Sequence, residues 1–82
     1  MGKNKKLPVP LVELMGDRRV LIEHHCGVSS YTGEEVTVRV AYGMIRIQGS
    51  GLCIARMCRE QLVILGRIRS VALEKGEGHG GK

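Results

Sequence analysis

Aromatic residues are nearly absent from this chain of 82 residues, which contains no Phe, no Trp and only two Tyr, Tyr31 and Tyr42. The hydrophobic fraction is nevertheless 43%, so any core must be built from Val, Ile and Leu, which suit a pleated sheet. A chain this short forms one domain and buries only about 60% of its unfolded surface. The thin aliphatic core therefore predicts a domain that self-association or a partner would stabilise.

Long hydrophobic runs and an even number of cysteines are also lacking. No stretch reaches the roughly 20 apolar residues of a membrane span, and residues 1–6 are not followed by the apolar core of a signal peptide. Three cysteines cannot all pair within one chain, which favours a reducing compartment with free thiols. We therefore expect a cytoplasmic protein without a transmembrane segment of its own.

The net charge of +5 is carried partly by the two ends of the chain. Residues 1–6 include three lysines, and residues 75–82 are rich in glycine with scattered charges. Neither segment can bury apolar surface, so both are predicted to be disordered tails. The folded domain is expected over residues 7–74.

Within that domain the apolar residues recur with a period of two, which is typical of β-strands. The clearest case is V-T-V-R-V at residues 36–40. Strands are predicted, in chain order, around residues 11–14, 20–22, 36–40, 45–48, 52–54, 62–65 and 68–73. The connections are too short for crossover helices, so neighbouring strands should pair as antiparallel hairpins. The predicted fold is all-β: a small single-domain antiparallel meander, as a rolled sheet or a partly closed barrel.

Glycine marks the predicted boundaries between several of these strands. Gly43, Gly49 and Gly66 are expected in turns, where glycine adopts φ values that are costly for other residues. The apolar spacing slips after Ile68, which predicts a β-bulge near Ser70. Residues 57–61 are ambiguous, because their composition also allows a helical turn.

His24, His25 and Cys26 stand side by side and suggest a metal site or a catalytic pair. Neighbouring side chains on a strand point to opposite faces, so three adjacent ligands do not converge on one ion. The spacing of Cys53 and Cys58 is not that of a zinc knuckle.

Catalysis by a thiol activated by His25 is also disfavoured, because no motif places an acid to orient the imidazole. We favour a turn in which Glu23 or His25 hydrogen-bonds the backbone and Gly27 has an unusual φ. We therefore expect no catalytic residue, no metal and no cofactor, and a protein that is not an enzyme.

Four arginines alternate with core positions and are predicted to face solvent: Arg39, Arg46, Arg67 and Arg69. Such a basic stripe is a possible interaction surface for phosphates or an anionic membrane leaflet. Outward arginines also simply keep sheet edges from pairing with other chains.

An Sm-like small barrel that binds RNA is the alternative binding module, since I-L-G-R-I-R-S-V at residues 64–71 resembles the closing strands of such barrels. The shortage of aromatic side chains argues against single-strand binding, which usually depends on base stacking. The composition therefore argues against nucleic acid as a partner.

Several short motifs occur together in a fixed order between residues 14 and 73. Ile-Glu with a nearby His and Gly is followed by Tyr, then Glu-Val, then G-x-I-x-I-x-G, and finally I-x-G-x-I-x-S-V. Together they resemble the YabP/YqfC family of sporulation proteins, and the YqfC branch most closely. The motif residues with proposed structural roles are Glu23, His25, Gly27, Tyr31, Glu35, Gly43, Gly49, Gly66 and Ser70. His24 departs from the pattern, since the family typically has Asn there.

The resemblance implies a non-enzymatic protein made during endospore formation in Firmicutes. It would act in the cytoplasm of the mother cell, peripheral to the forespore outer membrane, and contribute to the spore coat and cortex. A membrane-bound sporulation protein is the implied partner, and a homo-oligomer is a further possibility. From the sequence, contact would be made by an edge strand, with residues 11–14 and 61–65 as the two candidates.

Overall fold

The computed structural model describes residues 9–75, and no helix occurs among them. The six strands are β1 (Leu11–Met15), β2 (Arg19–Glu23), β3 (Val28–Tyr31), β4 (Glu35–Val40), β5 (Gly43–Met57) and β6 (Gln61–Lys75). The predicted all-β fold is confirmed. The predicted tails, residues 1–6 and 75–82, lie outside the described residues except for Lys75, which ends β6.

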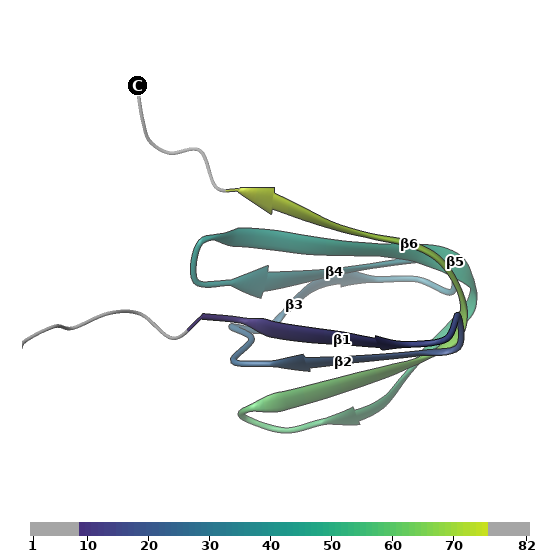
Figure 1. Ribbon diagram of the computed structural model, residues 1–82, viewed down its shortest axis with the longest axis horizontal. Coiled ribbons are helices and arrows are strands. Elements are labelled where there is room, and N and C mark those ends of the chain that lie inside the picture. The colour runs from purple at the N-terminus through teal and green to yellow at the C-terminus, as the bar shows by residue number, and fades with distance from the viewer. Residues whose placement is uncertain (1–8, 76–82) are drawn as a thin grey trace, which may run out of the picture.

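All six strands belong to one antiparallel sheet in the order β1-β2-β6-β5-β4-β3. Strands β5 and β6 are 15 residues long, and both bend sharply at the same end of the molecule (Figure 1). The bend folds the sheet over itself into two layers. One layer contains β1, β2 and the hairpin end of β5 and β6, and the other contains β3, β4 and the remaining halves. The sheet is rolled but not closed, which is the first of the two predicted forms.

Glycines at the bend allow the two long strands to cross closely. A Cβ atom on Gly49 would lie 2.0 Å from the carbonyl oxygen of Arg67, and one on Gly66 would lie 2.7 Å from that of Gly51. The prediction that Gly49 and Gly66 lie in turns between strands is therefore wrong. The chain stays in the sheet through both positions, because glycine here admits a neighbouring backbone instead of reversing the chain.

Two local predictions about β6 have opposite outcomes. The bulge near Ser70 is confirmed, because Gln48 pairs with Ser70 while Gly49 pairs with Ile68, which leaves Arg69 unmatched. The helical turn at residues 57–61 is wrong. That segment is the tip of the β5–β6 hairpin, closed by the Cys58 N–H donating to the Gln61 carbonyl at 2.9 Å.

The edge strands are β1 and β3. The prediction that residues 11–14 form an edge strand is confirmed, because they belong to β1. The alternative edge, residues 61–65, is wrong because this half of β6 pairs with β2 on one side and β5 on the other. Edge status depends on the spatial order of strands, which local spacing does not specify.

The turn of the β1–β2 hairpin, residues 16–18, lies against the bend of β6. Gly66 and Ile68 donate their N–H groups to the carbonyls of Arg18 (3.2 Å) and Asp17 (2.7 Å). This contact satisfies backbone groups that the bend removes from the strand ladder.

The β3–β4 hairpin occupies the corresponding position on β5. Its turn, residues 32–34, accepts hydrogen bonds from the N–H groups of Gly49 (3.0 Å) and Leu52 (2.8 Å) at the carbonyls of Glu34 and Gly33. The fold therefore repeats one arrangement twice: a short hairpin that covers the bend of a long strand.

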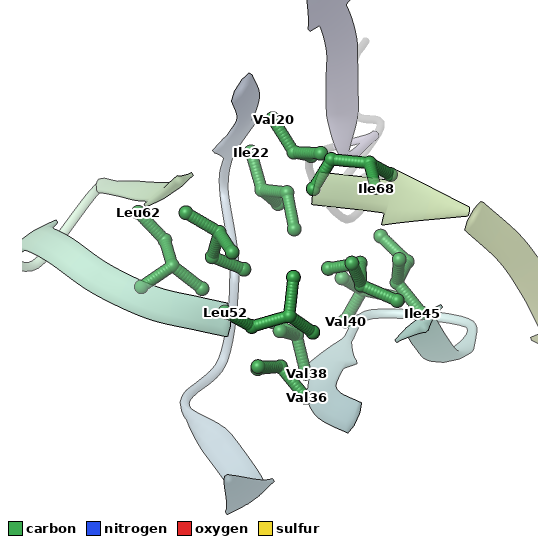
Figure 2. Close-up of a cluster of buried hydrophobic side chains, with 11 residues drawn as sticks. Val20, Ile22, Val36, Val38, Val40, Ile45, Leu52, Leu62 and Ile68 are labelled. Atoms are coloured by element: carbon green, nitrogen blue, oxygen red, sulfur yellow. The ribbon is translucent and has the colours of Figure 1, made fainter. Parts of the chain in front are cut away.

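Between the two layers lies a core of eleven aliphatic side chains (Figure 2). They come from β2, β4, β5 and β6: Val20, Ile22, Val36, Val38, Val40, Ile45, Ile47, Leu52, Leu62, Ile64 and Ile68. The core contains no aromatic side chain, as the composition predicts. The period-two alternation therefore identified the buried face of each of these strands.

Candidate functional site

His25 connects the turn after β2 to the tip of the β5–β6 hairpin. Its Nδ1 accepts the N–H of Gly27 at 3.0 Å, and its Nε2 lies 2.9 Å from the carbonyl oxygen of Cys58. A carbonyl only accepts, so Nε2 carries the proton and the ring is the neutral Nε2–H tautomer. Gly27 has φ 113°, a value that favours glycine. Both ring nitrogens are used by backbone groups, which is the geometry of a structural turn.

His24 stands in the left-handed region, with φ 65°, and its N–H donates to the Glu60 carbonyl at 2.9 Å. It is the one described non-glycine residue with a positive φ. Asn adopts this conformation readily because its short side chain can bond locally. The backbone conformation at this position would therefore suit Asn as well as His.

Replacing His24 with Val should lower the free energy of unfolding by about 1–2 kcal/mol, because a β-branched residue is strained at this φ. His24→Asn should be neutral or stabilising. Urea denaturation followed by circular dichroism would measure both, with Cys26→Val as an exposed neighbouring control. Equal effects of the two substitutions at residue 24 would contradict this account of the turn.

The three cysteines are exposed and do not gather with the histidines into a metal site. No group of three or more His, Cys, Asp or Glu side chains within residues 9–75 is arranged to hold a metal ion. Cys58, at the hairpin tip, is held by the backbone N–H groups of Glu60 and Gln61, which lower the pKa of its thiol below the ordinary 9.0. The thiolate is stabilised there, although no described acid–base pair accompanies it.

Arg46 lies in an ion-pair network on the outer face of the β4–β5–β6 layer. Its Nε and Nη2 donate to the two carboxylate oxygens of Glu74 at 2.9 and 3.0 Å, and its Nη1 donates to Glu35. These bonds raise the pKa of Arg46, and the same contact lowers the pKa of Glu74. Arg46 is thus neutralised by carboxylates from both neighbouring strands and ties three strands together.

The other arginines do not form one stripe, because Arg39 lies far from Arg67 and Arg69. Arg39 pairs with Met44, whereas Arg67 pairs with Ser50, six residues further along β5 and so about 20 Å away. Arg67 instead shares an open pocket of about 520 Å³ at the bend with Arg18, and Arg69 lies in the adjacent bulge. The sequence did not indicate Arg18, since its proximity depends on the β1–β2 turn covering the bend.

The remaining motif residues make contacts between strands. The Tyr31 hydroxyl accepts the Ile54 N–H at 3.4 Å, the Ser70 hydroxyl donates to Gln48 at 3.2 Å, and Glu23 accepts from Gln61 at 3.2 Å. Gly43 follows the β4–β5 turn and begins β5. These residues position the sheet, and none of them converges with the others on a cavity.

The sequence did not predict that the apolar side chains of β1 are exposed. All five of its residues are exposed, although four of them are apolar. Leu14 is 53% exposed and Leu11 48%, so the strand presents apolar side chains at a free sheet edge. The sequence L-V-E-L-M carries the signal, but only the sheet order shows that nothing within residues 9–75 covers it.

The model of the YabP family matches residues 7–80, which includes every strand and the residues discussed above. The chain belongs to the YabP family. The predicted family membership is therefore confirmed, and the match makes this YabP-family chain a sporulation-associated protein. Glu23, His25 and Gly27 lie within the matched region, at the turn that His25 holds against the hairpin tip.

No curated protein and no solved structure matches the chain. Among residues 9–75 there is no helix long and apolar enough to cross a membrane.

Proposed function

We propose that this YabP-family protein is a non-enzymatic component of spore envelope formation that acts through protein contacts. The family match carries the assignment to sporulation. Contribution to the coat and cortex, in the mother cell and beside the forespore outer membrane, is the finer part of the proposal. The partner would be a membrane-bound sporulation protein, which this chain would bind at the membrane surface without spanning it.

Two observations support action by protein contact. The apolar edge strand β1 offers backbone hydrogen bonds and exposed aliphatic side chains, the two elements that strand addition uses. At the bend, Arg18 and Arg67 line one open pocket, and the Nε of Arg18 lies 3.7 Å from the carboxylate of Asp17. Arg67 has no ion pair within residues 9–75, so this end presents a cation to an acidic partner. The motif histidine is used by backbone groups, which supports a structural role for it.

The Sm-like RNA-binding alternative has less support. Arg46 is neutralised by Glu35 and Glu74, which removes one of the four arginines that motivated it. Tyr31 and Tyr42 are the two tyrosines of a sequence that contains no Phe and no Trp. Base stacking platforms are therefore scarce.

Deletion of the gene should leave vegetative growth unchanged and either block spore formation or weaken spore resistance.

Crosslinked pulldown from sporulating mother cells, read by mass spectrometry, should recover a sporulation membrane protein. Arg67→Glu combined with Arg69→Glu should abolish the recovery, whereas Arg59→Glu, in the turn between β5 and β6 and away from the bend, should retain it. Normal spores from the deletion strain, or recovery of RNA without a protein partner, would refute the proposal.

A further inference from the structure

β1 is a sheet edge without the usual protection against pairing. Leu11, Val12, Leu14 and Met15 are between 37% and 53% exposed, and Glu13 is the one charge in the strand. The opposite edge strand, β3, reads V-S-S-Y and is mainly polar. Edge strands are usually blunted by charge or polarity, so the contrast points to β1 as a contact surface.

A second free edge lies on the final residues of β6. β2 pairs with this strand only as far as Leu65, and residues 70–75 pair with β5 alone. Val71 and Leu73 oppose the buried Ile47 and Ile45 and therefore point to the core face, yet Leu73 is 57% exposed. Within residues 9–75, the core face of the sheet is thus open at this side.

The two free edges border the same open side of the molecule. A cavity of about 500 Å³ is lined by Val9 and Pro10, which precede β1, together with Tyr42, Leu73 and Lys75. We call this side the mouth and define it by Val12 and Leu14 of β1 and Val71 and Leu73 of β6. Aliphatic side chains from both layers are exposed there, and covering them would extend the core.

The opposite side of the molecule, which β3 borders, differs from the mouth. Tyr31, the last residue of β3, reaches across to β5, where its hydroxyl accepts the Ile54 N–H at 3.4 Å. The residue in the equivalent place on β1 is Met15, whose thioether is only a weak acceptor. At the mouth, β1 therefore has no counterpart of the hydrogen bond that Tyr31 makes between β3 and β5.

We propose that two copies of this chain close each other's mouths in a twofold dimer. In this dimer β1 of each copy pairs antiparallel with residues 70–75 of the other. The dimer occupies β1, which leaves the pocket of Arg18 and Arg67 at the bend as the surface for the partner of the proposed function. Its test uses only the purified chain, so its failure is distinguishable from a failure of the role in sporulation.

Strand directions fit this arrangement. β1 runs toward the bend and the second half of β6 runs away from it, so the two are antiparallel within one molecule (Figure 1). A twofold axis parallel to the strands keeps the direction of every strand. It brings β1 of each copy beside residues 70–75 of the other copy. Both junctions then form at once, and the assembly closes as a dimer, the commonest symmetric form.

The register is chosen from the cavity, the side-chain directions and the charges. Val9 and Pro10 line the same cavity as Leu73 and Lys75, so the two segments lie at about the same level. We place Pro10 level with Lys75, which sets Val12 opposite Leu73 of the other copy, with both side chains on the core face. In that register Glu13 faces Ala72. A shift of one residue would turn the apolar side chains outward, and a shift that brings Glu13 opposite Glu74 would oppose two carboxylates.

Light scattering and analytical ultracentrifugation of the full chain would test the dimer. The native protein should have twice the chain mass of 9.0 kDa. Val12→Lys and Leu73→Glu should each raise the dissociation constant by about 100-fold or more. Each substitution places a charge in both junctions of the dimer, and each buried charge should weaken the dimer by about tenfold. Ser29→Lys on β3 is the matched control and should leave the dimer unchanged.

An equimolar mixture of the Val12→Lys and Leu73→Glu proteins should restore dimers. One junction is then native, and the other sets Lys opposite Glu. Both residues are exposed in the single chain, so circular dichroism should show every variant folded. A native monomer at all soluble concentrations, growth beyond dimers, insensitivity to Leu73→Glu, or no recovery in the mixture would each overturn the proposal.

Discussion

Gly49→Ala should destabilise this protein by about 3 kcal/mol or more, and Gly49→Val should prevent folding. Gly49 is buried in β5 at the bend, and an added Cβ would lie 2.0 Å from the carbonyl oxygen of Arg67 and 3.2 Å from the Cα of Ile68. Both obstacles are backbone atoms of β6, which cannot move aside by rotating a side chain. Relief requires the two long strands to separate where the layers fold.

Two other glycines provide graded controls for this experiment. Gly33 has open space around its Cα and no positive φ, so Gly33→Ala should change the free energy of unfolding by less than about 0.5 kcal/mol. Gly51 is also open but has φ 60°, so Gly51→Ala should cost about 1 kcal/mol from backbone strain alone.

Urea denaturation monitored by circular dichroism would order the three variants. If Gly49→Ala is no less stable than Gly51→Ala, the close strand crossing is not what this glycine permits.

The same position shows where sequence reasoning succeeds and where it stops. Alternation at residues 36–40 predicted buried Val36, Val38 and Val40 correctly, because burial on one face of a strand has a period of two. The sequence also marks Gly49 as a special position. The predicted turn is wrong, since a glycine required by a turn and one required by a neighbouring backbone look identical in the sequence.

Side-chain partners show the same limit. Arg46 was predicted to face solvent as part of a basic stripe, but it is bracketed by Glu35 and Glu74. Those partners lie 11 and 28 residues away in the chain, and they meet Arg46 only through the register of three strands. Local spacing identifies which face a residue occupies, whereas strand order identifies what lies beside it.

Leu62→Ala should lower the free energy of unfolding by about 3 kcal/mol. Leu62 is 0% exposed and belongs to the aliphatic core between the layers (Figure 2). Truncating a fully buried Leu costs about 2–5 kcal/mol, through lost transfer free energy and the cavity that remains. The core has no aromatic side chain large enough to collapse into such a cavity. The loss is therefore expected near the middle of that range.

The adjacent Val63 is the matched control, because it separates burial in the core from burial on the outer face. Val63 is 7% exposed but lies outside the core cluster, since successive strand residues point to opposite faces. Val63→Ala should cost about 1 kcal/mol, as neighbouring surface side chains can close over the gap. Small domains have only about 5–15 kcal/mol of stability, so Leu62→Ala should produce a large shift in the urea midpoint. Equal shifts for the two variants would mean that the layers do not pack as a single aliphatic core.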